Sequence, residues 1–145
     1  MLREFALSSR LVTGLLVSML LLGCSDEPFD YVKVSGKVTY EDGSLIAAER
    51  IQVTFLSQSG PLDAKTHPRP GLAEVNVDDG TFEEVTSHKF GDGVVPGKHK
   101  VLVVATDMNG SPLPVIPPAY ANAKQTPHEV DTADTPFHFK VRKPK

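Results

Sequence analysis

From Val32 onward, hydrophobic residues recur at every second position, and this period restricts the fold more than any other feature of the chain. In the segment 32–40, valine, glycine and tyrosine alternate with lysine, serine and threonine. The same period returns in the segments 51–55, 73–77 and 137–141. Because successive side chains of a β-strand point to opposite faces, each segment predicts a strand with one buried face and one face in water.

Turn residues and one continuous hydrophobic run predict the remaining strands. Asp and Gly tolerate the positive φ of tight turns, so the stretch 78–80 (Asp-Asp-Gly) predicts a hairpin turn with a return strand over 81–86. Pro96 and Gly97 predict a type II turn. The run 101–104 is hydrophobic at every position, which is typical of a central strand between two layers.

The chain after Cys24 has no sustained helical period, and only 45–50 has room for a short turn of helix. Twelve prolines and eleven glycines suit a fold with many turns. We therefore expect an all-β domain, a single antiparallel β-sandwich of about seven strands, over residues 32–145. The formal net charge is −3 and there is no basic patch, which argues against a nucleic-acid partner.

A charged start, a short apolar run and a cysteine follow one another at the N-terminus. The apolar run 11–22 is too short for a bilayer span, which needs about 20 residues, but it suits the core of a secretory signal peptide. Its ending, Leu21-Leu22-Gly23-Cys24, resembles the lipobox of bacterial lipoproteins, although Leu22 stands where Ala or Ser is usual. The resemblance implies cleavage before Cys24 by signal peptidase II and a diacylglyceryl group on its thiol. The alternative is a signal anchor or a buried N-terminal helix with an accidental cysteine.

These features divide the chain into a signal peptide helix (1–23), a tether (24–31) and one domain (32–145). Cys24 is the single cysteine, so a disulfide within the chain is impossible. We expect a protein of the cell envelope, held to a membrane by the lipid on Cys24, with its domain facing the periplasm or the exterior.

Several short motifs follow one another in the body. A Gly-x-Val strand leads through a turn to a Val-x-Phe strand, and an Asp-Asp-Gly-Thr-Phe hairpin and a Pro-Gly strand come later. The stretches concerned are 34–38, 51–55, 77–82, 95–101, 116–120 and 137–139. In this order they resemble the carboxypeptidase regulatory-like, or transthyretin-like, β-sandwich of small lipoproteins abundant in Planctomycetes. The residues 47–50 replace a usual proline-containing lead, and His99 stands where an aromatic residue is usual. The resemblance implies a fold and an envelope setting but no reaction, because fold does not fix function.

Residues for metal chemistry are present but not in metal-binding patterns. The histidines are His67, His88, His99, His128 and His138. No two have the H-x-H or H-x-x-x-H spacing, so we expect surface or edge histidines and no metal or other cofactor. A site assembled from distant histidines is the alternative. The Asp-Asp-Gly turn at 78–80 and Asp92 suggest calcium, but they miss the EF-hand pattern, and a hairpin explains the turn without an ion.

Motifs for catalysis are also missing from the sequence. No serine lies in a G-x-S-x-G elbow. The chain lacks the Tyr-Arg-Gly-Ser ending of hydroxyisourate hydrolase and the paired histidines of intradiol dioxygenases, two enzyme families with related sandwiches. Glu83 and Glu84 fit a solvated strand face better than an acid–base pair. We therefore expect no enzyme.

The proline-rich stretch 111–118 favours an extended path. We expect a stiff crossover loop laid over the sandwich, with its end pinned by Tyr120; the alternative is a ligand for a partner's groove. The expected role is a non-catalytic structural or protein-binding module that uses this loop or a strand edge, with envelope proteins or polysaccharide as partners. A carbohydrate-binding or transport accessory is the other hypothesis, and it requires exposed aromatic residues. Its possible suppliers are Tyr31, Tyr40, Phe90 and Tyr120.

Overall fold

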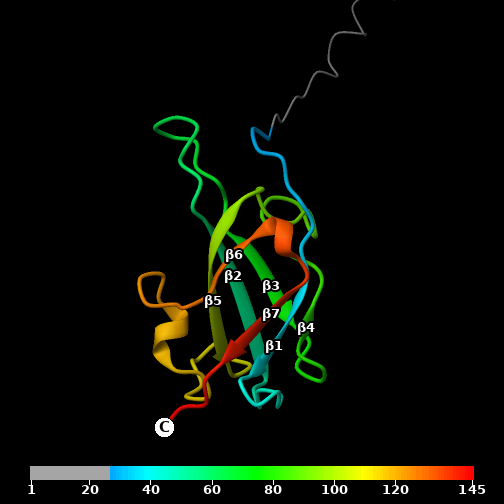
Figure 1. Ribbon diagram of the computed structural model, residues 1–145, viewed down its shortest axis with the longest axis vertical. Helices are drawn as coiled ribbons and strands as arrows, with labels where there is room; N and C mark the ends of the chain where they lie inside the picture. Colours follow the sequence, from blue (N-terminus) through cyan, green and yellow to red (C-terminus); the bar gives the residue numbers. More distant parts are fainter. Residues whose placement is uncertain (1–26) are drawn as a thin grey trace, which may run out of the picture.

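The computed structural model describes residues 27–145 and places their strands in two sheets (Figure 1). The three-stranded sheet has the order β4 (Thr81–Phe82), β1 (Gly36–Tyr40), β7 (Phe137–Val141). The four-stranded sheet has the order β3 (Gly71–Val75), β2 (Arg50–Ser57), β5 (Lys98–Thr106), β6 (Glu129–Asp131). Two short 3-10 helices complete the described part, η1 (Pro118–Ala121) and η2 (Thr132–Asp134). The expected all-β class is confirmed.

The pairing departs from the expected antiparallel arrangement in one place. In the four-stranded sheet every pair is antiparallel, and β1 pairs with β4 in the same way. However, β1 and β7 are parallel, with Gly36 opposite Phe137 and Tyr40 opposite Val141. Parallel neighbours cannot be joined by a tight hairpin, and these two strands lie near opposite ends of the described chain.

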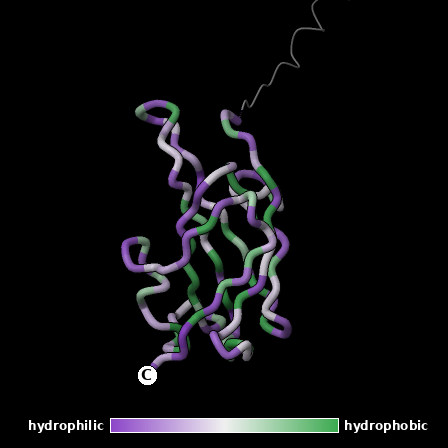
Figure 2. Tube along the Cα trace, viewed as in Figure 1, coloured by the Kyte–Doolittle hydropathy of each residue, from purple (hydrophilic) through white to green (hydrophobic). Residues whose placement is uncertain are grey.

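The hydrophobic core takes buried side chains from both sheets. Phe55 on β2 is fully buried, and its ring lies about 6 Å from those of Phe82, Phe137 and Phe139 in the other sheet. Figure 2 shows hydrophobic residues mostly along the strands and hydrophilic residues in the projecting loops. Burial of each large apolar side chain contributes about 1.5–3 kcal/mol, so the expected period-two pattern is the main source of stability.

Two predicted strands are shorter in the structure. The strand expected from Val32 begins at Gly36, and Val32 forms only an isolated bridge with Val94. The return strand expected over 81–86 is limited to Thr81–Phe82, and it pairs with β1 rather than with β3. The expected hairpin is present in part: the Asn76 amide donates to the Thr81 carbonyl at 2.8 Å across the turn, and the returning chain meets β3 again at the antiparallel bridge between Leu72 and Thr86.

Gly36 shows why these strands can meet closely. A Cβ atom at this position would lie 2.6 Å from the carbonyl oxygen of Phe137 and 2.7 Å from the ring of Phe82. Only glycine leaves room for both neighbours of β1 at this point.

Other differences concern β5 and the short elements. As predicted, β5 lies inside its sheet, but only its inner face is fully buried, since Leu102 and Val104 on the outer face are half-buried. No helix forms over 45–50. Three or four residues are too few to show a period, so β6, η1 and η2 leave no pattern in the sequence that predicts them.

Candidate functional site

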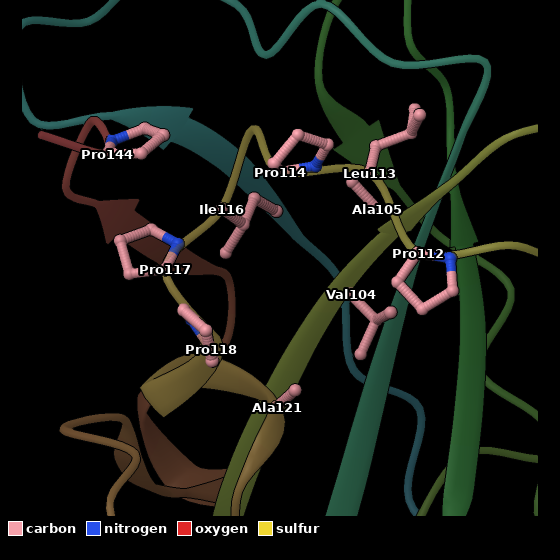
Figure 3. Close-up of a pocket in the computed structure, with 10 residues that line it drawn as sticks. All are labelled: Val104, Ala105, Pro112, Leu113, Pro114, Ile116, Pro117, Pro118, Ala121 and Pro144. Atoms are coloured by element: carbon pink, nitrogen blue, oxygen red, sulfur yellow. The ribbon is translucent and has the colours of Figure 1, made fainter.

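An apolar pocket lies beneath the proline-rich stretch (Figure 3). Its volume is about 430 Å³, which is within the range of small-ligand pockets. Its lining consists entirely of residues with apolar side chains: Val104, Ala105, Pro112, Leu113, Pro114, Ile116, Pro117, Pro118, Ala121 and Pro144. We call it the proline pocket.

The proline-rich stretch is held to the sheets at three points. The Leu113 amide donates to the Ala105 carbonyl at 2.9 Å. The Tyr40 hydroxyl donates to the Val115 carbonyl at 2.7 Å. Beyond them, Tyr120 is buried and its hydroxyl accepts from the Arg142 amide at 3.0 Å. The prediction that Tyr120 pins the end of the stretch is confirmed, but the stretch is not a crossover, because β5 and β6, which it joins, are antiparallel neighbours in one sheet.

The lining of the proline pocket decides what it can bind. It offers no ionisable side chain and no hydroxyl group, so a buried polar group of a ligand would lose water without regaining hydrogen bonds from side chains, at a cost of about 1–3 kcal/mol. Proline rings also lose little conformational entropy on binding. The pocket therefore suits an apolar group, and it lacks the residues for acid–base or nucleophilic chemistry.

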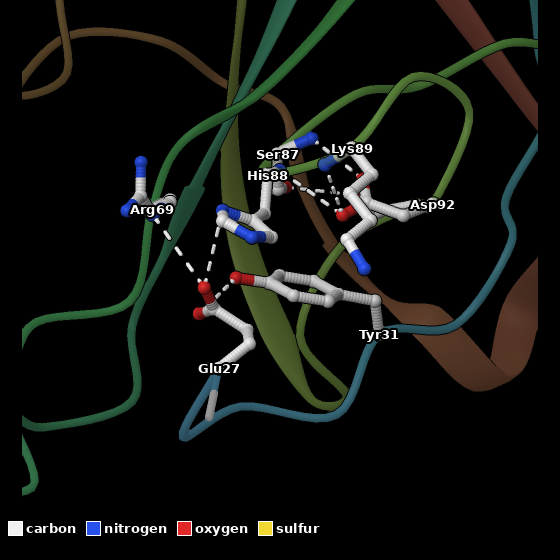
Figure 4. Close-up of polar contacts among 8 residues, drawn as sticks. Glu27, Tyr31, Arg69, Ser87, His88, Lys89 and Asp92 are labelled. Carbon is white, nitrogen blue, oxygen red and sulfur yellow. Dashed lines mark hydrogen bonds and ion pairs between the residues drawn. The ribbon is translucent and has the colours of Figure 1, made fainter. Parts of the chain in front are cut away.

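A polar cluster lies at the other end of β5, where the described chain begins (Figure 4). Glu27 is at its centre. Its carboxylate accepts a hydrogen bond from the Tyr31 hydroxyl at 2.7 Å and lies 3.1 Å from His88 Nδ1 and 4.0 Å from Arg69 Nε. The described part of the predicted tether, residues 27–31, is therefore attached to two loops of the body.

Asp92 organises the loop that carries His88. Its carboxylate accepts hydrogen bonds from the backbone amides of Ser87, His88 and Lys89 at 2.8–3.0 Å. Burial alone would raise the pKa of Asp92, but these hydrogen bonds outweigh it and hold the pKa below its usual range. The carboxylate thus stays ionised and caps the loop. This structural role accounts for Asp92 without a calcium ion.

The contacts of the cluster attach the N-terminal segment to the body. Burial, followed by the hydrogen bond to Glu27, raises the pKa of Tyr31 to about 12, so its hydroxyl remains a donor at neutral pH. The Glu27 carboxylate is shared by three side chains. We conclude that the cluster fastens residues 27–31 to the body.

The expectation of surface or edge histidines is wrong for His99 and only partly right for His128. His99 is 1% exposed and packs edge-on against Phe55, because it occupies an inward-facing position in the alternating burial pattern of β5. His128 is half-buried between the rings of Tyr120 and Phe139. Burial lowers the pKa of both histidines, and both Nδ1 atoms are buried without a hydrogen-bond partner among the described residues.

The remaining histidines do not gather at one place. His138 is exposed on β7 and lies 2.8 Å from the Thr39 hydroxyl, and His67 is exposed in the loop after β2. Within residues 27–145, no three His, Cys, Asp or Glu side chains are grouped as a metal ion would require.

The acidic and aromatic residues that the sequence suggested for binding do not gather at one place either. Asp79 accepts from the amide and hydroxyl of Thr81 and thus caps its turn, while Glu83 and Glu84 are exposed. Among the aromatic candidates, Tyr40 and Tyr120 are buried, Tyr31 is half-buried and Phe90 is 84% exposed. The structure therefore does not bring the four together as a stacking platform.

The lipobox residues Leu21, Leu22, Gly23 and Cys24 lie outside the described residues. From residue 27 to the end of the chain, no helix is long and apolar enough to cross a membrane.

Sequence reasoning found the proline-rich stretch but missed its partners. Val104, Ala121 and Pro144 come from three separate segments, and nothing local marks them as neighbours. The same holds for Glu27 and Arg69, whose pairing depends on how a long loop folds back. A scan against protein-family models and searches of curated proteins and of solved structures found no match to this chain.

Proposed function

We propose that this protein is a lipid-anchored envelope protein whose domain binds an apolar segment of another envelope protein and catalyses no reaction. The proposed arrangement is a signal peptide over 1–23, a diacylglyceryl group on Cys24 and a transthyretin-like β-sandwich over 32–145. In this proposal the two sheets are the layers of the sandwich.

The anchor is supported by the order of features in the first 24 residues. A charged start, a short apolar run, a small residue and the single cysteine of the chain occur in the sequence needed for lipoprotein processing. Two or more acyl chains on one residue hold a protein stably on a membrane, whereas one chain does not. The chain is attached to the body from Glu27 onward. Cys24 therefore lies at most about 11 Å from this attachment, the length of the extended chain between them.

The observation that carries the proposed binding role is the proline pocket. Its apolar lining favours an apolar occupant, and rigid prolines keep it open. It also lies far from the anchor: Glu27 contacts loops at the Lys98 end of β5, whereas Val104 and Ala105 lie at the other end. Nine strand residues span about 26 Å. A pocket on the side away from the anchoring bilayer favours a protein segment over the acyl chains of that bilayer.

The anchor is tested by intact mass and membrane partitioning in a host that processes lipoproteins. We expect the wild type to partition with membranes at the mass of residues 24–145 plus acyl chains, and Cys24→Ala to lose both properties. A wild type that is not membrane-bound, or that keeps residues 1–23, would show that the proposed anchor is wrong.

The binding role is tested by photo-crosslinking from position 118, where Pro118 is exposed at the pocket rim. We expect an adduct to a protein segment that disappears when Ala121→Arg places a charged side chain in the pocket. Ala133→Arg, at an exposed alanine of η2, is the matched control and should leave the adduct unchanged. Adducts only to lipid or polysaccharide, or adducts insensitive to Ala121→Arg, would contradict the proposal.

A further inference from the structure

Two of the most exposed large hydrophobic side chains lie on loops at the end of the domain where the described chain begins. Phe90 is 84% exposed and Leu62 is 60% exposed. In Figure 1 the loop after β2 and the first described residues project from the same end of the molecule. Leu62 lines a shallow hollow together with Glu27 and Phe29, while His88, two residues before Phe90, contacts Glu27. Both loops therefore border the N-terminal segment.

Each loop is stabilised in a way that presents its hydrophobic side chain outward. Asp92 accepts from the amides of Ser87, His88 and Lys89, and the Gly91 amide donates to the Thr86 hydroxyl at 3.0 Å. The bonds on both sides of Phe90 fix the loop while its ring stays in water.

The loop with Leu62 is built in the same manner. Asp63 accepts from the amides of Lys65 and Thr66 at 2.8 and 2.9 Å, and the Leu62 amide donates to the Thr66 carbonyl at 2.9 Å. Two separate loops thus combine an aspartate cap with an exposed apolar residue. Because apolar surface in water is unfavourable, this arrangement calls for an apolar partner.

We propose that Phe90 and Leu62 insert into the bilayer that holds the anchor, so that the domain rests on the membrane with this end down. The inference rests on the proposed lipid at Cys24. Two residues separate Cys24 from Glu27, so the attached end stays within about 11 Å of the membrane surface. At that distance the bilayer is present at high effective concentration, and weak insertion of two side chains is enough to orient the domain.

The charges at this end favour apolar insertion over attraction to anionic lipids. The segments 27–30, 57–70 and 86–93 carry three permanent cations, Lys65, Arg69 and Lys89. They also carry four carboxylates, Glu27, Asp30, Asp63 and Asp92. The end is therefore not basic, and the contact should form equally well on a vesicle of phosphatidylcholine, which has no net charge.

The absence of tryptophan from the chain allows a direct test. Phe90→Trp gives the full-length lipidated protein a single reporter, which is reconstituted into phosphatidylcholine vesicles with or without brominated acyl chains. We expect its emission to shift to shorter wavelength on reconstitution and to be quenched by the brominated lipid. Met108→Trp is the matched control, because Met108 is 68% exposed but follows the opposite end of β5; it should be neither shifted nor quenched.

Intact mass and flotation with vesicles establish the anchor independently of fluorescence. If the Phe90→Trp variant carries acyl chains and floats, but its emission is that of a water-exposed indole and is not quenched, the insertion is wrong while the anchor stands. Equal quenching in the Met108→Trp variant would also overturn the inference, since it would mean that the domain has no preferred orientation.

Discussion

The two ends of the domain are held together by different kinds of interaction. At the proline pocket, loop and sheet are joined by buried rings and apolar side chains, and the few hydrogen bonds involve uncharged groups such as the Tyr40 and Tyr120 hydroxyls. At the N-terminal end, Glu27 and Asp92 join the segments through ion pairs and backbone amides. Each end also contains a tyrosine and a histidine. They are Tyr120 and His128 near the proline pocket, and Tyr31 and His88 at the N-terminal end.

This difference predicts that one end is rigid and that the other can open separately. Apolar burial contributes to stability in proportion to area and is insensitive to salt, whereas exposed ion pairs contribute about 0–1 kcal/mol and weaken with salt. The end with the proline pocket should therefore be tied to global stability. The N-terminal end should open at little cost to the rest of the fold.

The largest expected difference between the two ends is the loss of unfolding free energy when one tyrosine at each end is replaced by alanine. Tyr120→Ala removes a ring that is 5% exposed and leaves a cavity beside His128, so we expect a loss of about 3–4 kcal/mol in the free energy of unfolding. Tyr31→Ala removes a half-buried ring that packs on the surface, and its cost should stay below about 1.5 kcal/mol. Urea unfolding of both variants measures the difference.

Tyr120→Phe is the control for this comparison. It keeps the ring and removes only the hydroxyl that accepts from the Arg142 amide, so it should cost about 1 kcal/mol. Equal losses for Tyr120→Ala and Tyr31→Ala would contradict the distinction between the two ends.

Much of the fold follows from side-chain period and turns. The strands around Val53, Val103 and Phe139 were predicted because alternation directly reports one buried face. The pairing of β4 was not predicted: the chain turns back at 78–80 as expected, yet Thr81 and Phe82 pair with β1 in the other sheet, where the Phe82 ring lies 6.1 Å from that of Phe55. Partners chosen by tertiary packing leave no local signal in a single sequence.

The site was predictable to a smaller extent. Proline density marked the stretch 111–118, because proline restricts the backbone locally. The burial of His99 was missed, although its place in an alternating strand pointed inward, since histidine is more often found near water. The partners of Glu27 required the folded loops and had no pattern to reveal them.

Acidification should weaken the domain through two buried histidines, His128 beside Tyr120 and His99 at the opposite end of β5 from the proline pocket. Burial lowers the pKa of His128 and His99, so the folded state keeps both neutral while the unfolded chain takes up protons below about pH 6.5. Their stabilising effect is full above that pH and is lost as the pH falls, by at most about 1.4 kcal/mol per pH unit for each histidine. For His99, Asp131 and the Val95 carbonyl favour the charged form and partly offset burial.

Unfolding in urea between pH 7.5 and 5.5 measures this dependence, above the range in which carboxylates titrate. His99→Phe removes one titrating group while keeping a ring beside Phe55, so its stability should fall less steeply than that of the wild type. His67→Gln changes an exposed histidine and serves as the control. A slope unchanged by His99→Phe but reduced by His67→Gln would show that burial is not the cause.

The smallest expected effect is at the centre of the polar cluster. Glu27→Gln keeps an acceptor for the Tyr31 hydroxyl but removes the charge facing Arg69 and His88. We expect a loss of about 0.5 kcal/mol in low salt that disappears in 1 M salt. The measurement is the difference in unfolding free energy from the wild type at the two salt concentrations.

Glu83→Gln is the matched control, because Glu83 is exposed and has no ion-pair partner among residues 27–145. A loss at Glu27 that persists in 1 M salt would mean that hydrogen bonding, not charge, holds the N-terminal segment. A loss as large as that of Tyr120→Ala would mean that this end is part of the cooperative core. In that case residues 27–31 would unfold together with the sheets and not separately from them.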